Sequence, residues 1–218
     1  MAKQLNPDTY IMHSTDSIDP SKNETQRTIS KEAINALPLI QWTGPTKVLN
    51  TMEEFADAAV QLSEASILGF DTETRPSFKK GEYYPTSLLQ LASDSCVYLF
   101  RLKTAANLQA LVPLFESEHI IKTGVAIHDD LKALQKLCPF SPQGFVEITQ
   151  LTAQLAYTSK GLRALAALLL GGRVSKAAQV SNWARRELEP KQIQYAATDA
   201  WISRELYLQA CKEQSEKL

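Results

Sequence analysis

The chain has 218 residues, of which 44% are hydrophobic and 22% are charged, and its formal net charge is −1. These values are typical of a globular protein with one substantial core. No apolar stretch approaches the roughly 18–20 residues that a membrane helix needs. A protein that coats long nucleic-acid duplexes usually carries a strongly basic face. The charge therefore argues against that class, and any contact with nucleic acid is expected to be local, at a strand end.

The cysteines Cys96, Cys138 and Cys211 lie far apart in the sequence, and none belongs to a CxxC unit. This spacing argues against a zinc site or a disulfide framework. It predicts buried or half-buried thiols in a reducing compartment. The N-terminus is polar and does not resemble a signal peptide. We therefore expect a cytoplasmic protein without a membrane partner.

The N-terminal part of the chain lacks apolar periodicity. Residues 1 to about 30 are rich in polar residues and are predicted to form a flexible tail. Residues 29–50 are expected to cross the domain as an extended arm, so that 1–50 precede a domain at 51–218. That domain opens with Thr51, and Glu54 follows three residues later, which is the pattern of a capping box. Apolar residues at helical spacing over 52–62 predict the first helix.

The rest of the chain alternates strands with helices. Strands are expected, in chain order, at residues 66–73, 86–92, 96–102, 120–125 and 145–148. Helices are expected at residues 104–111, 130–137, 149–157, 162–170 and 190–213. Pro113 breaks or restarts the first of these, Gly171 ends the fourth, and Pro190 suits the first turn of the last. The order predicts an α/β fold with a mixed five-stranded sheet flanked by helices.

Two carboxylates, Asp71 and Glu73, end the first predicted strand. Because strand side chains alternate between faces, both point to the same side. Neighbouring carboxylates repel each other unless one is protonated or a cation lies between them. A hard divalent cation such as Mg²⁺ or Mn²⁺ would remove that repulsion. The alternative is a pair of solvated carboxylates at a strand end.

Asp130 follows the strand at 120–125 and begins a predicted helix. Asp favours the first turn of a helix, which explains the residue without any further function, and Asp129 serves that purpose equally well. If the strands at 66–73 and 120–125 run parallel, however, their carboxyl ends meet at one edge of the sheet. Asp130 then lies near Asp71 and Glu73.

Tyr195 and Asp199 are four residues apart in the last predicted helix and share one face. Ala196, Ala197 and Ala200 surround them, and such small residues allow a helix to approach a sheet closely. A packing face with an exposed Asp is the simpler interpretation of the same pattern.

Three segments together resemble the motifs of the DEDD superfamily of exonucleases. They are residues 70–74 (FDTET), 124–131 (GVAIHDDL) and 195–199 (YAATD), the last in the tyrosine-bearing form. Residues 145–147, 174–176 and 181–183 resemble the branch that contains ribonuclease D and Werner-type exonucleases. The resemblance covers about residues 51–210. Three motifs in order are far more specific than any one of them.

The resemblance implies a ribonuclease-H-like fold and metal-dependent hydrolysis from a 3′ end by a two-metal mechanism. It makes Asp71, Glu73, Asp130 and Asp199 the ligands of two divalent ions, Mg²⁺ or Mn²⁺. Two such ions would balance the four negative charges and stabilise both the attacking and the leaving oxygen. Tyr195 becomes the residue that orients the attacking water, since its reference pKa of about 10 makes it a poor base. Asp129 stays open as an alternative to Asp130.

Contacts with the nucleic acid are expected from Thr72, Phe78, Lys79 and Lys176. Phe78 is predicted to stack on the terminal base, and such stacking contributes about 1–3 kcal/mol. The family places an apolar wedge near this position, but Ser77 stands at the equivalent spacing. An exposed loop with ordinary solvated Lys side chains is the competing interpretation.

The expected partners are single-stranded or recessed 3′ ends, and the sequence does not distinguish DNA from RNA. We expect a stand-alone catalytic domain. A non-catalytic nucleic-acid-binding or adaptor protein on the same fold is the alternative from another class. The intact acidic set argues against that alternative, and the pairing of Tyr195 with Asp199 argues against an endonuclease.

Overall fold

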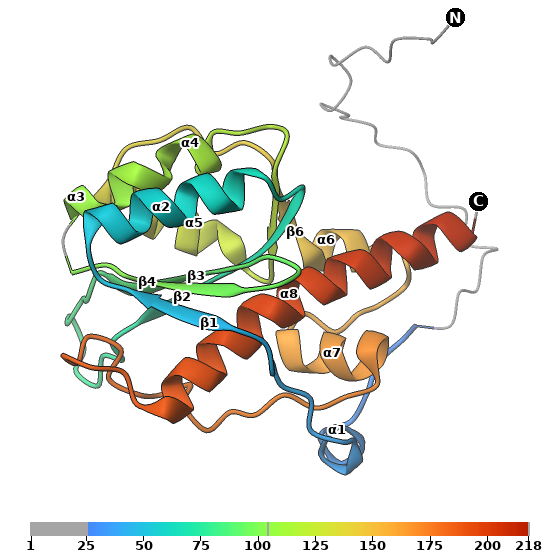
Figure 1. Ribbon diagram of the computed structural model, residues 1–218. Coiled ribbons are helices and arrows are strands. Elements are labelled where there is room, and N and C mark those ends of the chain that lie inside the picture. The colour runs from blue at the N-terminus through green and yellow to red at the C-terminus, as the bar shows by residue number, and fades with distance from the viewer. Residues whose placement is uncertain (1–25, 104, 218) are drawn as a thin grey trace, which may run out of the picture.

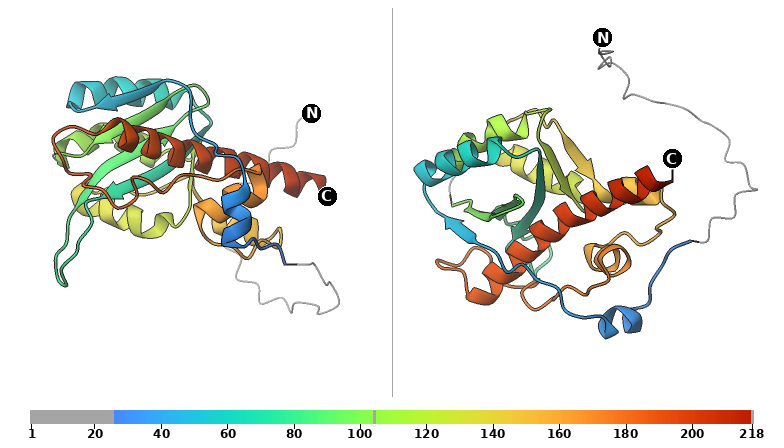
Figure 2. Two further views of the ribbon diagram at one scale, coloured as in Figure 1. Left: turned by 90° about the horizontal axis from the view of Figure 1, so that it is seen from below. Right: turned by 45° about the vertical axis from the view of Figure 1, so that its right-hand side comes forward.

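A computed structural model describes residues 26–103 and 105–217 of the chain. It shows a mixed sheet with helices on both faces, as Figures 1 and 2 show. The predicted α/β class is therefore confirmed. The expected flexible tail at residues 1 to about 30 falls almost entirely outside the described residues.

The sheet has six strands in the order β1-β4-β3-β2-β5-β6, instead of the expected five. β2 pairs with β3 and β3 with β4 in antiparallel fashion, whereas the β1–β4, β2–β5 and β5–β6 pairs are parallel. The strands are β1 Thr46–Leu49, β2 Ile67–Thr74, β3 Thr86–Ala92, β4 Val97–Arg101, β5 Ile121–Gly124 and β6 Phe145–Glu147. β2 and β5 run parallel, which is the condition under which Asp130 was expected to lie near Asp71 and Glu73.

The helices form two layers. Four of them, α2, α3, α4 and α5, cover one face of the sheet, and the long α8 crosses the other face beside α7 (Figure 1). Their bounds are α1 Lys31–Ala36, α2 Met52–Ser63, α3 Ala105–Leu108, α4 Val112–Phe115, α5 Ile127–Leu137, α6 Ile148–Ala153, α7 Leu162–Leu170 and α8 Pro190–Glu216. A short 3-10 helix at Gln109–Leu111 links α3 to α4, and Pro113 restarts the helix there.

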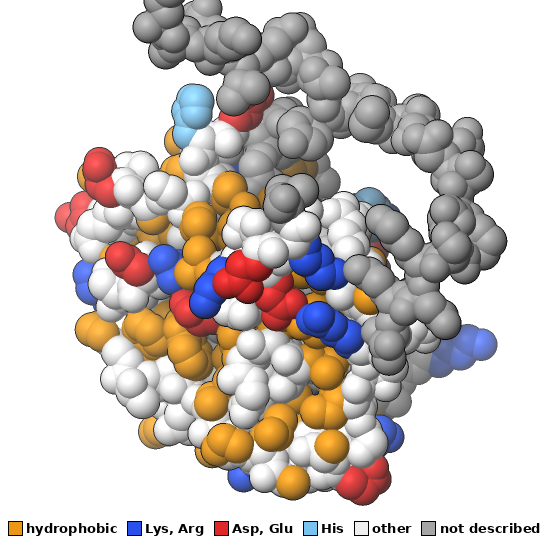
Figure 3. Space-filling view, turned by 90° about the vertical axis from the view of Figure 1, so that its right-hand side faces the viewer, with side chains coloured by type: hydrophobic (Ala, Val, Ile, Leu, Met, Phe, Trp, Pro, Cys, Tyr) orange, Lys and Arg blue, Asp and Glu red, His pale blue; other side chains and the backbone are white. Residues whose placement is uncertain are grey.

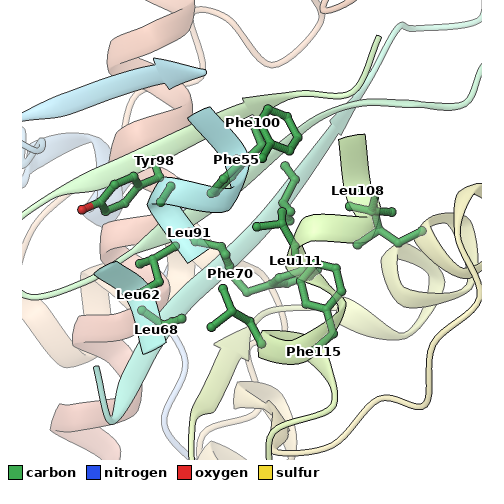
Figure 4. Close-up of a cluster of buried hydrophobic side chains, with 14 of the residues drawn as sticks. Phe55, Leu62, Leu68, Phe70, Leu91, Tyr98, Phe100, Leu108, Leu111 and Phe115 are labelled. Carbon is green, nitrogen blue, oxygen red and sulfur yellow. The ribbon is translucent and has the colours of Figure 1, made fainter. Parts of the chain in front are cut away.

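The main hydrophobic core lies between the sheet and the α2 to α5 layer. Phe55 of α2 packs edge-on against Phe100 of β4, with ring centroids 4.9 Å apart, and both side chains are fully buried (Figure 4). Residues from α2, β2 and α4 complete the cluster, including Leu62, Phe70 and Phe115. A second cluster joins α6 and α7 to the C-terminal half of α8. A third cluster packs the N-terminal half of α8 against β3 and β4, and so fixes α8 on the sheet.

The capping box predicted at the start of the domain is present. The Thr51 side chain accepts a hydrogen bond from the Glu54 N–H at 3.2 Å, and the Glu54 carboxylate accepts one from the Thr51 N–H at 2.9 Å. This reciprocal pair satisfies two of the amide groups that a helix start leaves without partners. α2 therefore begins at Met52, as the pattern predicts.

The N-terminal arm is more ordered than an extended segment, and this difference adds the sixth strand. Ser30 caps the short helix α1 by accepting a hydrogen bond from the Ala33 N–H at 3.1 Å. Residues 46–49 then form β1 at the edge of the sheet, parallel to β4. Four residues give too little alternation to reveal an edge strand in the sequence, because its pairing depends on a distant partner.

The three cysteines are free thiols. Cys96 and Cys138 are buried and Cys211 is half-buried, as predicted. Within the described residues, no helix is both long enough and apolar enough to cross a membrane.

Candidate metal centre and active site

The carboxyl end of β2 faces the middle of α8, and a glycine allows them to approach. A Cβ atom on Gly69 would lie 1.9 Å from the Ala200 carbonyl oxygen, so only glycine fits there. Ala196, Ala197 and Ala200 on α8 are buried against the sheet, as their small size predicts. This close contact brings Asp199 of α8 to the carboxylates that follow Gly69 on β2.

Asp71, Glu73 and Asp199 converge on one point. One carboxylate oxygen from each lies within 4.8 Å of the others. Asp71 and Glu73 share a face of β2, as strand alternation predicts, and Asp199 completes the group from across the contact. The three line a cleft of about 380 Å³, together with residues of α7 and of the segment before α8.

Burial raises the pKa values of all three acids, and the charges of neighbouring acids add to this effect for Asp71 and Glu73. Burial, together with the charges of Asp71, Asp199 and Asp130, raises the pKa of Glu73 to about 10. Burial, with the charges of Asp199 and Asp130, raises the pKa of Asp71 well above its usual value. Burial likewise raises the pKa of Asp199 to about 7. The group as it stands is strongly self-repelling when ionised, which is the condition that a bound cation relieves.

The donor set fits a divalent cation. Asp199 is only 4% exposed, and its Oδ1 atom is buried. This atom has no hydrogen-bond partner in the described part of the chain. Buried polar atoms normally have partners, so this oxygen is available to a ligand. All three groups are carboxylates, the oxygen ligands that Mg²⁺ and Mn²⁺ prefer.

Asp130 lies beside this group rather than inside it. Its Oδ1 atom accepts a hydrogen bond of 2.5 Å from the Thr72 hydroxyl. Its charge is close enough to raise the pKa values of Asp71 and Glu73. Burial raises the pKa of Asp130 itself to about 6. Asp130, the fourth predicted carboxylate, thus lies at the rim of the cluster, where the hydrogen bond from Thr72 holds it.

Asp129 lies on the solvent-exposed surface of α5. Its side chain is 92% exposed and lies 3.6 Å from the Lys132 ammonium in an ion pair along the helix. The adjacent Asp130 carboxylate is half-buried at the Thr72 contact. Of the two neighbouring acids, Asp130 is the one that contacts a residue lining the cleft.

The start of α5 explains how Asp130 reaches Thr72. The helix begins at Ile127, three residues before the predicted start, and Ala126 takes the left-handed backbone conformation with φ of 61°. The Glu147 carboxylate at the end of β6 accepts a hydrogen bond from the Ile127 N–H at 3.0 Å. Because this cap comes from a distant strand, the local sequence did not indicate it. The sharp turn before α5 requires Ala126 to adopt the left-handed backbone conformation, which is unfavourable for a residue that has a Cβ atom.

Tyr195 lies one helical turn before Asp199 and lines the same cleft. Its ring packs against Trp183 with centroids 5.9 Å apart, which fixes its position. Burial and the negative charges of Asp199 and Glu73 raise the pKa of Tyr195 far above its usual value. The hydroxyl therefore stays protonated and can donate a hydrogen bond.

The predicted nucleic-acid contacts fall into two places. Thr72 and Lys176 line the cleft beside the carboxylates. Phe78 and Lys79 do not line it, and instead border a neighbouring pocket. The prediction that Phe78 meets the terminal base is therefore without support from the geometry of the cleft.

Sequence reasoning missed other residues at the site. Arg163 of α7 lines the cleft, donates a hydrogen bond of 2.9 Å to the Val174 carbonyl, and lowers the pKa of Asp199 by its charge. In the sequence, the one sign that Arg163 has a special role was its position as a charged residue inside the apolar run of α7. Gln90 of β3 lies directly opposite Asp71 and is fully buried, with neither amide atom paired within the described residues. Nothing in the sequence indicated the β2–β3 register that places Gln90 opposite Asp71.

Comparison with known proteins agrees with this geometry. The family described as 3′–5′ exonuclease matches residues 46–213. The bifunctional 3′–5′ exonuclease/ATP-dependent helicase WRN of Mus musculus is 31% identical over 157 residues, 69% of this chain and 11% of the relative. Exonuclease 3′–5′ domain-containing protein 2 of Drosophila melanogaster is 30% identical over 192 residues, 85% of this chain and 31% of the relative. The chain thus spans less than a third of either relative.

Solved structures show the same fold. The EXO domain of Aedes aegypti Nibbler superimposes with a TM-score of 0.73 at 23% identity, covering 81% of this chain and 93% of that domain. Escherichia coli RNase D gives a TM-score of 0.66 at 20% identity, covering 78% of this chain and 46% of that one. The ribonuclease-H-like fold implied by the motifs is confirmed. On the strength of the family match over most of its length, the chain belongs to the 3′–5′ exonuclease family.

Proposed function

We propose that this chain is a metal-dependent 3′–5′ exonuclease that hydrolyses phosphodiester bonds at the 3′ end of DNA or RNA. The convergence of Asp71, Glu73 and Asp199 at one point of a cleft is the observation that carries this proposal. Membership of the exonuclease family supports the reaction. The placement of Asp130 and Tyr195 around the cluster supports the expected division of roles.

Asp71, Glu73, Asp130 and Asp199 would hold two divalent ions, Mg²⁺ or Mn²⁺. When bound, such ions stabilise negative charge on phosphoryl oxygens and lower the pKa of bound water. Asp71, Glu73 and Asp199 lie in the cleft with Asp130 at its rim, and the charges of neighbouring acids contribute to the raised pKa values of Asp71 and Glu73. Two divalent ions supply four positive charges and balance the four carboxylates.

Tyr195 serves to position the attacking water. Its hydroxyl keeps its proton because burial and the neighbouring acids raise its pKa. A protonated hydroxyl cannot act as the base, but it can donate a hydrogen bond that fixes the orientation of a water molecule. The packing of Tyr195 against Trp183 holds that donor in place.

The cleft suits a chain end better than a continuous duplex. Its volume of about 380 Å³ lies near the lower end of the range of small-ligand sites. Arg163 and Lys176 supply positive charge at its wall, where a phosphate would lie. On the face in Figure 3, Lys and Arg side chains are interspersed with Asp and Glu side chains, in line with the net charge of −1.

The test uses matched single-stranded and recessed oligonucleotides of DNA and RNA, labelled at the 5′ or the 3′ end. Each is incubated with Mg²⁺, Mn²⁺ or EDTA, using wild type, Asp71→Asn and Tyr195→Phe. We expect stepwise shortening from the 3′ end with metal, none in EDTA or with Asp71→Asn, and a reduced rate with Tyr195→Phe. Relative rates on the matched substrates identify the sugar.

Internal cuts, shortening from the 5′ end, or activity that survives EDTA would overturn the proposal. Binding of the oligonucleotides without cleavage in either metal would favour the non-catalytic alternative.

A further inference from the structure

A second pocket of about 370 Å³ lies beside the metal cleft. It is bordered by the loop between β2 and β3 and by the segment that precedes α8. This loop projects from the sheet in the left view of Figure 2. The residues that matter here are Arg75, Phe78, Lys79, Tyr84, Val180 and Asn182.

The same two chain segments form both pockets, one after the other. On the first segment, Asp71 to Glu73 line the metal cleft, and the second pocket is lined by Arg75, Pro76, Phe78 and Lys79. On the second segment, Lys176 and Gln179 line the metal cleft, and Val180 and Asn182 line the second pocket. A strand whose end lies at the carboxylates would therefore run directly into the second pocket.

Phe78 has the properties of a base-stacking residue. Its side chain is 81% exposed, and no other aromatic ring in the described part of the chain packs against it. Val180, across the pocket, is 68% exposed. An exposed aromatic ring beside an apolar wall can sandwich a nucleobase without choosing among bases.

Two cations of the pocket, Arg75 and Lys79, have N–H groups that could bind phosphate. Arg75 lies 4.5 Å from the centroid of the Tyr84 ring, and no hydrogen bond or ion pair of the described residues uses its guanidinium N–H groups. The Lys79 ammonium likewise has no partner there. Glu82 is the one acid among the pocket residues, so the two cations outnumber it. The pocket thus presents positive charge and an aromatic surface together, which matches a single nucleic-acid strand.

We infer that this pocket binds the single-stranded nucleic acid that adjoins the terminal nucleotide, with a base stacked on Phe78 and phosphates held by Arg75 and Lys79. The inference rests on the proposed exonuclease function and extends it. It assigns Phe78 and Lys79 to the strand that enters the cleft instead of to the nucleotide that is removed. The enzyme then prefers substrates with several unpaired nucleotides at the 3′ end.

The first test compares a dinucleotide with a single-stranded 12-mer, using wild type and two variants. Phe78→Ala should raise the KM for the 12-mer about tenfold, and leave kcat and dinucleotide cleavage within about twofold. Tyr83→Ala is the matched control, because Tyr83 is a 65% exposed aromatic of the same loop that lies outside the pocket, near Lys136. It should behave as wild type.

The second test measures binding without catalysis, by fluorescence anisotropy of a labelled 12-mer with Ca²⁺ in place of Mg²⁺. Phe78→Ala should weaken binding about tenfold, and Lys79→Ala should weaken it more than Lys80→Ala. Loss of the Arg75 and Lys79 contacts should also flatten the plot of log Kd against log salt, by about 0.7 for each phosphate contact removed.

The outcomes separate this inference from the proposed function. Equal losses on the dinucleotide and the 12-mer, or equal losses from Phe78→Ala and Tyr83→Ala, would overturn the inference while the exonuclease survives. A wild type that cleaves nothing would overturn the proposed function, and the anisotropy comparison would then decide the inference alone. Unchanged 12-mer affinity in Phe78→Ala refutes it in either case.

Discussion

Two adjacent acids differ sharply in their surroundings, and that difference predicts their roles. We expect Asp130→Asn to reduce kcat about 100-fold, because it removes a charge that faces the carboxylate cluster while keeping an acceptor for Thr72. Asp129→Asn should stay within about twofold of wild type, since it loses only an exposed ion pair with Lys132. Steady-state cleavage of one labelled oligonucleotide measures both. A larger loss in Asp129→Asn would reverse the assignment.

Side-chain direction within one element could be predicted, whereas contacts between elements could not. Strand alternation placed Asp71 and Glu73 on one face, and helical spacing placed Tyr195 with Asp199. The family pattern, more than geometry, added Asp130. Gln90 was missed because its position opposite Asp71 depends on the β2–β3 register, which sequence alternation alone does not fix.

At the scale of elements, the approach of α8 to β2 forms the site. A Cβ atom on Gly69 would clash with the Ala200 carbonyl oxygen, so Gly69→Ala must push α8 away from β2. We expect a loss of about 1–3 kcal/mol in the free energy of unfolding, measured by urea denaturation. Gly161→Ala is the control, because a Cβ atom there meets no atom within 4 Å. Equal stability of the two variants would show that the close contact is not required.

The N-terminal arm is attached to the helix that carries Asp199. The Trp42 N–H donates to the Thr198 hydroxyl at 3.2 Å, and the Gln194 amide donates to the Trp42 carbonyl at 2.6 Å. Thr198→Val should leave the Trp42 N–H without its acceptor and destabilise the protein by about 1–3 kcal/mol. We expect faster hydrogen exchange over residues 38–45.

A buried threonine elsewhere provides the control for this experiment. The Thr152 hydroxyl donates to the Ile148 carbonyl within its own helix, and it makes no hydrogen bond to the arm within the described residues. Thr152→Val should therefore leave exchange over residues 38–45 unchanged. If Thr198→Val also left it unchanged, the arm would be held by other contacts, such as the packing of Trp42 near Trp201.

Elements with strong local signals were predicted well. The capping box located α2, and Gly171 and Pro190 located the end of α7 and the start of α8. The edge strand β1 and the early start of α5 were not predicted. Both depend on distant partners, since β1 pairs with β4 and the Ile127 N–H donates to Glu147.

At the scale of the whole molecule, several acids concentrate negative charge in a chain of net charge −1. Their folded pKa values are raised, to about 6 for Asp130, 7 for Asp199 and 10 for Glu73. The metal-free folded protein therefore binds protons more tightly than the unfolded chain does. This stabilisation is complete below the unfolded pKa of about 4, and it is lost as pH rises through the folded values.

The melting temperature of the metal-free protein should consequently fall by several degrees between pH 5 and pH 8. Added Mg²⁺ or Mn²⁺ should raise it more at pH 8 than at pH 5, because ionised carboxylates bind the cation and protonated ones do not. Differential scanning fluorimetry with and without EDTA measures both effects. A metal-free protein that is more stable at pH 8 than at pH 5 would contradict the raised pKa values.

The central claim is that the carboxylate cluster is a divalent-metal site, and Mn²⁺ binding by isothermal titration calorimetry at pH 7.5 tests it most directly. We predict saturable binding of Mn²⁺ to wild type and to Asp129→Asn. For Asp199→Asn we predict affinity at least about tenfold weaker, with circular dichroism confirming that the variant folds. Equal Mn²⁺ affinity in wild type and a folded Asp199→Asn variant, or no binding by wild type, would contradict the account.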